Sequence, residues 1–216
     1  MEISTPPVTA QQWTRTMKQD GQPVLVFTLR RPCVPNSGKT NRMERYFAHL
    51  AQQWQTHWEN SLFPRACQAY TEAKERGEPF TAWQAELDYQ VTFWQPPLVS
   101  LRLSITETGP CDRPLCTCIG ETWDCSSGFP RTLRSFFPEQ GRRWRHELIA
   151  ALCTQAEMQL ASGESLLDPD CTRLTESAFD PDRFYLTAEG VAVFYPMYLL
   201  GPYAEGIPVF TIPLPQ

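Results

Sequence analysis

The segment that most constrains the fold of this chain is residues 183–214, where strand-forming residues alternate with turn-forming ones. Aromatic and β-branched residues dominate 184–187 and 191–195, and the short link between these runs ends in Gly190. Glycine readily adopts the positive φ that a short hairpin loop needs. After an aromatic loop, residues 209–212 return to the strand pattern. The segment therefore predicts a β-hairpin, an aromatic loop and one additional strand.

The first part of the chain predicts one strand followed by two helical segments. Residues 23–30 form a short apolar run that is typical of a strand. A helix is expected from Thr40, which suits the N-cap position, to residue 60. Its apolar residues recur at spacings of three and four, as on one helical face: Met43, Phe47, Leu50, Trp54 and Trp58. A second helical segment over 64–76 ends at Gly77.

The middle of the chain predicts two more strands and a second long helix. Strand patterns occur at 83–94 and 98–106, and the bend at Pro96-Pro97 between them favours antiparallel pairing. A helix over 141–160 would bury a face that carries Trp144, Leu148, Leu152 and Ala156. The element order indicates an α+β fold, with antiparallel sheet or sheets, two long helices packed on one face, and the C-terminal β-hairpin plus an additional strand.

The length of 216 residues suits one sizeable domain. We expect residues 1–20 to be a polar, partly disordered N-terminal segment and residues 21–216 to form a single compact α+β unit. Within that unit, an N-terminal half (21–107) and a C-terminal half (127–216) are joined by a cysteine-rich loop (108–126).

The formal net charge of −5 argues against a nucleic-acid partner, which needs a basic face. It suits a basic protein ligand, although such a charge is also ordinary among soluble bacterial proteins. No apolar run approaches the roughly twenty residues of a membrane span. The first residues lack the basic and apolar regions of a signal peptide. The sequence thus predicts a cytoplasmic protein, or an extracellular one if the chain is a trimmed part of a longer protein.

Four of the eight cysteines fall within a short stretch: Cys111, Cys116, Cys118 and Cys125. Four thiolates could form a structural zinc site, but the spacing lacks the paired C-x-x-C arrangement that would make this assignment specific. In an oxidising compartment the same cysteines would form one or two disulfides. In a reducing compartment they would be free thiols. The expected cofactor is none, with structural zinc as the alternative.

Catalytic motifs are absent from the sequence. There is no nucleophile elbow, no phosphate-binding loop and no dinucleotide fingerprint. The three histidines, His49, His57 and His146, have no recognisable partner in sequence, so we expect surface or capping roles for them. The sequence predicts a protein that is not an enzyme, and no catalytic residue is assigned.

The stretch FYLTAEGVAVFY followed by GPYAEGIPVFTIPL resembles the C-terminal signature of a bacterial domain of unknown function. That domain occurs in the lysozyme-sensing anti-sigma factor RsiV and, outside the catalytic domain, in the peptidoglycan deacetylase PdaC. The matching positions are Phe184, Tyr185, Leu186, Gly190, Tyr203, Gly206, Ile207 and Pro208. The family usually carries a Gly-x-His-Gly segment after its central strands, where this chain has the cysteine-rich CDRPLCTCIGETWDC.

The resemblance implies a non-enzymatic module that binds or senses a protein or cell-wall ligand, as the RsiV domain binds lysozyme. Because tyrosine is enriched at interface hot spots, we expect the aromatic loop to carry the ligand-binding residues. The candidate ligand-binding residues are Tyr198, Gly201, Tyr203, Glu205 and Gly206. Two alternatives stay open, namely a cell-wall-directed hydrolase and a zinc-stabilised structural protein.

Overall fold

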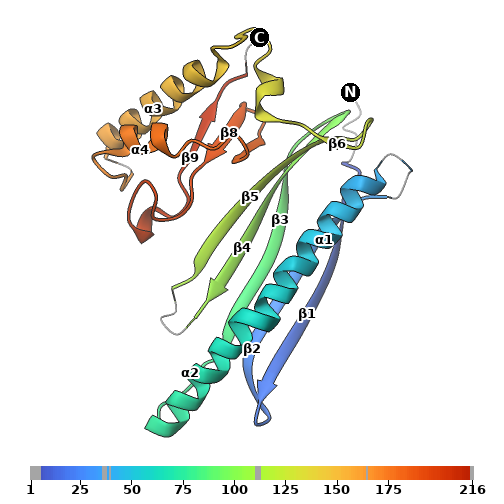
Figure 1. Ribbon diagram of the computed structural model, residues 1–216, viewed down its shortest axis with the longest axis vertical. Helices are drawn as coiled ribbons and strands as arrows, with labels where there is room; N and C mark the ends of the chain where they lie inside the picture. The colour runs from blue at the N-terminus through green and yellow to red at the C-terminus, as the bar shows by residue number, and fades with distance from the viewer. Residues whose placement is uncertain (1–5, 36–37, 39, 110–112, 164, 215–216) are drawn as a thin grey trace. The chain divides into compact units, whose positions relative to one another are not determined.

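The structure, a computed structural model, describes the chain except residues 1–5, 36–37, 39, 110–112, 164 and 215–216. It is a mixed α+β protein with a six-stranded sheet in the order β1-β2-β3-β4-β5-β6 and a three-stranded sheet in the order β7-β8-β9 (Figure 1). The α+β class predicted from the sequence is confirmed. The strands of the larger sheet are β1 (Thr9–Gln19), β2 (Gln22–Cys33), β3 (Trp83–Gln95), β4 (Leu98–Thr108), β5 (Leu115–Asp124) and β6 (Phe129–Pro130).

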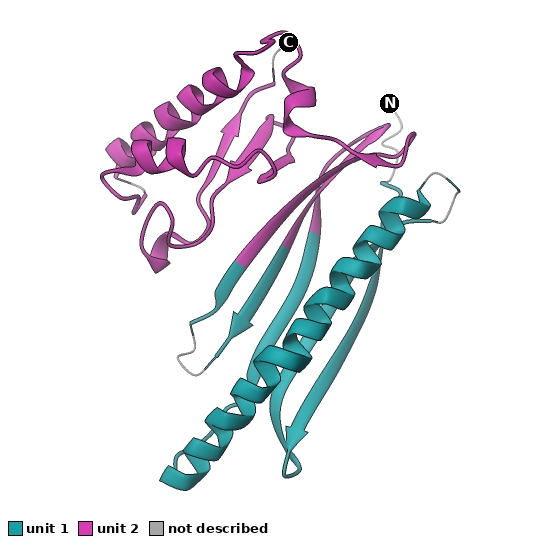
Figure 2. Ribbon diagram, viewed as in Figure 1, with its two compact units in different colours: residues 1–89, 104–116 teal, residues 90–103, 117–216 magenta. Residues whose placement is uncertain are grey.

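The chain packs as two compact units, which Figure 2 shows in different colours. The first unit comprises residues 1–89 and 104–116, and the second comprises residues 90–103 and 117–216. The units are therefore interleaved in sequence, unlike the two consecutive halves expected from the sequence. Each unit has its own buried residues and is described separately below.

The helical segments of the first unit form one continuous run along one face of β1, β2 and β3 (Figure 1). Helix α1 (Asn41–His57) passes through a π-helical turn (Trp58–Leu62) into α2 (Phe63–Arg76), so the break expected near residue 60 does not occur. As predicted, α2 ends at Gly77, whose φ of 68° is left-handed. Thr40 does occupy the N-cap position, but its hydroxyl donates to the Pro35 carbonyl instead of capping the helix.

Strands β2 and β3 pair in parallel, with Leu25 opposite Trp83 and Leu29 opposite Leu87. The sequence predicted antiparallel sheet or sheets and gave no sign of this parallel pair. The helical run between these strands is a crossover connection. It brings the chain back to the end of the sheet where β2 began, so β3 runs in the same direction as β2. Alternate residues of β2 face the helices, and the buried set of this unit includes Leu25, Phe27, Leu29, Met43, Phe47, Ala51, Trp58 and Leu87.

The N-terminal segment is more ordered than the sequence suggested. Residues 9–19 form β1, which pairs antiparallel with β2 along its whole length. The expected partial disorder of 1–20 is therefore wrong for this stretch. Its polar side chains are held from the helix side, since Trp13 donates to Gln55 at 3.3 Å and Arg15 forms an ion pair with Glu59.

The second unit contains the predicted C-terminal hairpin. Strands β7 (Phe184–Leu186) and β9 (Val209–Ile212) flank β8 (Val191–Phe194), and all pairings are antiparallel. Helix α3 (Trp144–Ser162) and the short helix α4 (Cys171–Ser177) cover one face of this sheet (Figure 1). Gly190 has a φ of 147°, and a Cβ there would lie 2.2 Å from the Ile212 carbonyl oxygen. The prediction of a glycine-dependent hairpin is confirmed.

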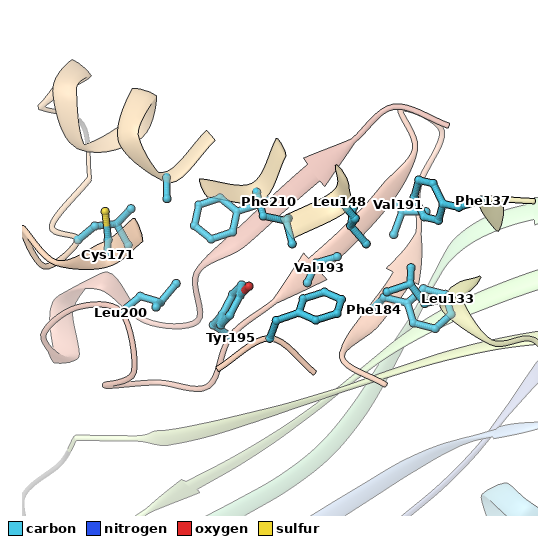
Figure 3. Packing of buried hydrophobic residues seen from close by; sticks show 14 of the residues in the cluster. Leu133, Phe137, Leu148, Cys171, Phe184, Val191, Val193, Tyr195, Leu200 and Phe210 are labelled. Carbon is cyan, nitrogen blue, oxygen red and sulfur yellow. The ribbon is translucent and has the colours of Figure 1, made fainter. Parts of the chain in front are cut away.

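The core of the second unit lies between α3 and the three-stranded sheet. Figure 3 shows its aromatic and aliphatic side chains, and it includes Leu133, Phe137, Leu148, Leu152, Phe184, Val191, Val193, Tyr195, Leu200 and Phe210. The predicted inner face of α3 is confirmed for Leu148, Leu152 and Ala156, whereas Trp144 is only half-buried. Helix α4 was not anticipated, because its sequence lies in an acidic, proline-containing connection.

The cysteine-rich stretch 108–126, expected to be a loop, contains strand β5. The expectation was wrong because Cys116 and Cys118 behave as small apolar residues within an alternating pattern that also contains Thr117 and Ile119. Further along β5, a Cβ at Gly120 would lie 1.9 Å from the Phe184 carbonyl oxygen. The β7 backbone thus rests directly on this glycine.

Candidate functional site

The loop between β8 and β9 exposes an aromatic pair. Tyr198 is 57% exposed, and its ring centroid lies 6.0 Å from that of Tyr203. The φ of Tyr198 is 65°, a left-handed conformation that is uncommon for a bulky residue. Strained backbone of this kind is maintained only where the surrounding structure enforces it, and it recurs at binding sites. Tyr198 is therefore the most distinctive exposed side chain of this loop.

The other three residues predicted for the loop organise it. A Cβ at Gly201 would lie 2.8 Å from the Leu166 carbonyl oxygen, so only glycine allows this close approach. The Glu205 carboxylate accepts hydrogen bonds from the Ser165 hydroxyl, at 2.9 Å, and from the Leu166 backbone N–H. Gly206 turns the chain with a φ of 72°. These residues attach the loop to the segment that precedes α4.

Two further backbone contacts hold the same loop. The Asp168 N–H donates to the Leu200 carbonyl at 2.7 Å, and the Tyr195 N–H donates to the Pro208 carbonyl at 2.9 Å. The Tyr195 hydroxyl in turn donates to the Thr175 carbonyl of α4 at 3.0 Å, and burial raises the pKa of this phenol. The loop is consequently preorganised, which reduces the entropy lost when a ligand binds.

A shallow groove of about 480 Å³ lies against the base of this loop. Pro196 and Leu199 line it and flank Tyr198 in sequence. Phe179 also lines the groove, and the guanidinium carbon of Arg145 lies 5.3 Å from the centroid of its ring. The polar lining includes an Asp180–Arg183 ion pair of 3.3 Å, and the remaining lining residues are Ser177, Ala178 and Pro181. Apolar rings and prolines around one ion pair are suited to binding a polypeptide segment.

The candidate zinc ligands that the structure describes are Cys116, Cys118 and Cys125, and it does not group them as metal ligands. Cys111 lies outside the described residues. Cys118 is on β5, and Cys125 follows the end of that strand, where its N–H donates to the Pro97 carbonyl at 2.8 Å. Six residues of extended chain lie between Cys118 and Cys125 and separate them by about 20 Å, too far for both to reach one ion at a Zn–S distance of about 2.3 Å. Across the described part of the chain, no three His, Cys, Asp or Glu side chains are grouped as metal ligands.

The thiols of the second unit are also poorly suited to nucleophilic chemistry. Burial raises the pKa of Cys118, and Arg102 only partly opposes this effect. Burial likewise raises the pKa of Cys125, as does the neighbouring Asp124 carboxylate. Because the thiolate is the reactive form, a raised pKa lowers reactivity at neutral pH.

The sequence analysis missed one polar constellation in the first unit. The Nε2 of His57 lies 3.2 Å from Glu107 Oε1, and the buried Trp58 indole donates to the same oxygen at 2.8 Å. These contacts join the π-helical turn to β4, and π-helical turns are frequent at functional sites. His57 and Glu107 are distant in sequence, so no local motif could reveal the pair. His49 and His146 are exposed, as expected.

The fold and this loop together define a class of protein, namely an α+β protein that presents a preorganised aromatic loop beside a three-stranded sheet. Residues 139–214 match the family described as "Protein of unknown function (DUF3298)", so this region is similar to DUF3298 domains. The matched region contains α3, the C-terminal sheet and the aromatic loop. The predicted resemblance to a domain of unknown function is confirmed at this level, and the relationship to RsiV and PdaC stays a prediction.

Two solved structures share the fold over most of the chain. A DUF3298 family member from Bacteroides fragilis has a TM-score of 0.66 at 15% identity, covering 95% of this chain and 89% of its own. A DUF3298 family protein from Pseudomonas aeruginosa PAO1 has a TM-score of 0.58 at 20% identity, covering 95% of this chain and 88% of its own. No curated protein is detectably similar in sequence. No described helix is both long and apolar enough to cross a membrane.

Proposed function

We propose that this protein is a non-catalytic module that binds a protein ligand through the Tyr198 surface, defined as Tyr198, Tyr203 and the groove beside them. The observation that carries the proposal is Tyr198 itself, a large and exposed aromatic side chain in a left-handed backbone conformation. Exposed tyrosine supplies a large contact area with little conformational entropy to lose. The anchoring by Glu205 supports the same interpretation, because it fixes the loop before binding.

Charge favours a basic ligand. The chain has a net charge of −5, and acidic surfaces steer positively charged proteins during association. The resemblance to the lysozyme-binding domain of RsiV points to the same class of ligand. Lysozyme, a small basic secreted protein, is thus the first probe to use.

The test measures binding of immobilised lysozyme to the wild-type protein and to Tyr198→Ala, with Met158→Ala as the matched control. Met158 is 66% exposed on α3 and is not part of the Tyr198 surface. We expect Tyr198→Ala to weaken binding at least tenfold, since an aromatic hot spot contributes about 2 kcal/mol or more. Met158→Ala should leave binding unchanged.

A parallel selection of displayed peptides against the wild-type protein separates the surface from the identity of the ligand. If lysozyme fails to bind but selected peptides lose affinity for Tyr198→Ala, the surface is correct and the ligand is another protein. If both lysozyme and the selected peptides bind Tyr198→Ala as tightly as wild type, the proposed surface is wrong.

A further inference from the structure

A second pocket lies at the start of α3 and does not involve the Tyr198 surface. It has a volume of about 180 Å³ and is lined by Phe137, Gln140, Trp144, Glu147, Leu148 and Ile212. Figure 3 shows two of these residues, Phe137 and Leu148, at the Val191 end of the core. The pocket lies almost wholly within the region that matches the DUF3298 family.

Two stacked rings form the apolar wall of this pocket. The rings of Phe137 and Trp144 are 6.4 Å apart between centroids and inclined by 23°. Phe137 is buried, whereas Trp144 is half-buried and so presents part of its indole to the pocket and to solvent. The face of an indole is the aromatic surface that attracts cations most strongly.

The polar side chains of the pocket, Gln140 and Glu147, both carry hydrogen-bond acceptors. Gln140 Oε1 is buried and has no hydrogen-bond partner within the described residues. Buried acceptors rarely lack a partner, so Gln140 Oε1 needs a donor, which either an ordered water or a ligand can supply. No side-chain hydrogen bond fixes the Gln140 amide in the described structure, so the amide can turn to meet a donor that enters the pocket.

The charge of the lining is negative. Glu147 is exposed at the rim, and it is the charged side chain among the described residues that line the pocket. The neighbouring arginines do not line it: Arg142 and Arg143 are exposed, and Arg145 lies over Phe179 instead. A carboxylate, an amide oxygen and an indole face together complement a cation.

The size of the pocket limits the ligand. Sites for drug-sized molecules measure about 300–1,000 Å³, so a cavity of about 180 Å³ accommodates a single amino-acid side chain. The aromatic rings of the pocket can contact an apolar side-chain stem, and its acceptors can contact a positively charged end group. A lysine side chain has both parts. We infer that this pocket binds a lysine side chain of a polypeptide partner.

The test is a titration of the full chain with N-acetyl-lysine methylamide, followed through the ¹H–¹⁵N resonance of the Trp144 indole. The Trp144→Phe variant assigns that resonance. The norleucine analogue, which has the same stem without the ammonium, and the arginine analogue serve as comparison ligands. We expect the lysine analogue to bind at least about fivefold more tightly than the norleucine analogue, because cation–π and exposed ion-pair interactions each contribute about 1 kcal/mol.

Two variants examine the acceptors. Glu147→Gln and Gln140→Leu should each reduce lysine affinity about fivefold, and Glu147→Gln should leave norleucine binding unchanged. Glu189→Gln, an exposed charge neutralisation in the β7–β8 turn, is the matched control and should have no effect. Thermal melting of each variant checks that the fold is retained.

The inference is overturned if the lysine and norleucine analogues shift the Trp144 resonance with equal affinity. It is also overturned if the arginine analogue binds more tightly, or if Glu147→Gln binds lysine as wild type does. Loss of lysozyme binding in Tyr198→Ala does not bear on this outcome, so the pocket and the Tyr198 surface can fail separately.

Discussion

The indole of Trp58 donates a hydrogen bond of 2.8 Å to the Glu107 carboxylate, which joins the π-helical turn to strand β4. Trp58 is completely buried and lies 5.4 Å from Phe27 between ring centroids. A buried indole N–H needs an acceptor, and the carboxylate of a residue far along the chain supplies it. The contact therefore fixes the helical run on the sheet.

Removing that acceptor should destabilise the protein. Glu107→Leu leaves the Trp58 N–H unpaired, and we expect a loss of about 1–3 kcal/mol in the free energy of unfolding, measured by urea denaturation. Glu107→Gln keeps an acceptor and should lose less than about 1 kcal/mol. Equal losses in the two variants would show that the hydrogen bond is not the cause.

The backbone at Tyr198 supplies a second prediction. Because its φ is 65°, Tyr198→Gly should relieve strain and raise the free energy of unfolding by about 1 kcal/mol relative to Tyr198→Ala. Both variants should lose ligand binding to the same degree. Chemical denaturation together with the lysozyme assay checks this, and a glycine variant less stable than the alanine variant would contradict it.

The close approach of the β7 backbone to Gly120 supplies a third prediction. Gly120→Ala places a Cβ 1.9 Å from the Phe184 carbonyl oxygen, so we expect a loss of at least about 3 kcal/mol or a failure to fold. Gly109→Ala is the control, since its nearest neighbour is the Trp83 side chain at 3.9 Å. Thermal melting of both variants compares them directly. A Gly120→Ala protein that melts with the wild type would refute the packing described for β7.

The pH dependence of stability should include a contribution from Asp124. Hydrogen bonding from the Ser126 hydroxyl lowers the pKa of this carboxyl, and the Ser126 and Ser127 N–H groups and Arg131 add to the effect. A lowered folded-state pKa means that the stabilisation is complete above the unfolded value of about 3.9 and is lost as the pH falls through the folded value. The stability difference between wild type and Asp124→Asn should therefore shrink as the pH falls below about 4. Urea midpoints at each pH measure it, and a difference that does not change with pH contradicts it.

The metal content of the purified protein can also be predicted. Because Cys118 and Cys125 lie far apart on and beyond β5, we expect protein purified without chelators to contain less than about 0.1 equivalent of zinc. Elemental analysis measures this. One equivalent of zinc, released on unfolding, would require a different arrangement of the cysteine-rich stretch.

Sequence patterns correctly predicted the elements that are determined by neighbouring residues. The β7–β8 hairpin follows from strand residues around Gly190, and the end of α2 follows from Gly77, because each depends on a backbone conformation that neighbouring residues reveal. The loop containing Tyr198 and Tyr203 was also located from composition and resemblance. The strained φ of Tyr198 could not be predicted, because backbone strain depends on contacts between the loop and distant parts of the chain.

The features that were missed depend on distant partners. The polar sequence of β1 suggests a disordered N-terminal segment. Its backbone pairing with β2 and its contacts with α1 nevertheless hold it as a strand. The His57–Glu107 pair and the parallel pairing of β2 with β3 each join residues separated by the helical run or by further strands. Sequence periodicity carries no information about such partners.

The parallel pairing of β2 with β3 also sets an order of assembly. Leu25 and Trp83 are separated in sequence by the whole helical run, and contacts so distant in sequence form slowly. The β1–β2 hairpin joins strands that are adjacent in sequence, so it can form earlier. We therefore expect amide protons of β1 and β2 to gain protection before those of β3 in pulsed hydrogen exchange, so that during folding the inner edge of β2 is for a time an open docking site for any extended chain.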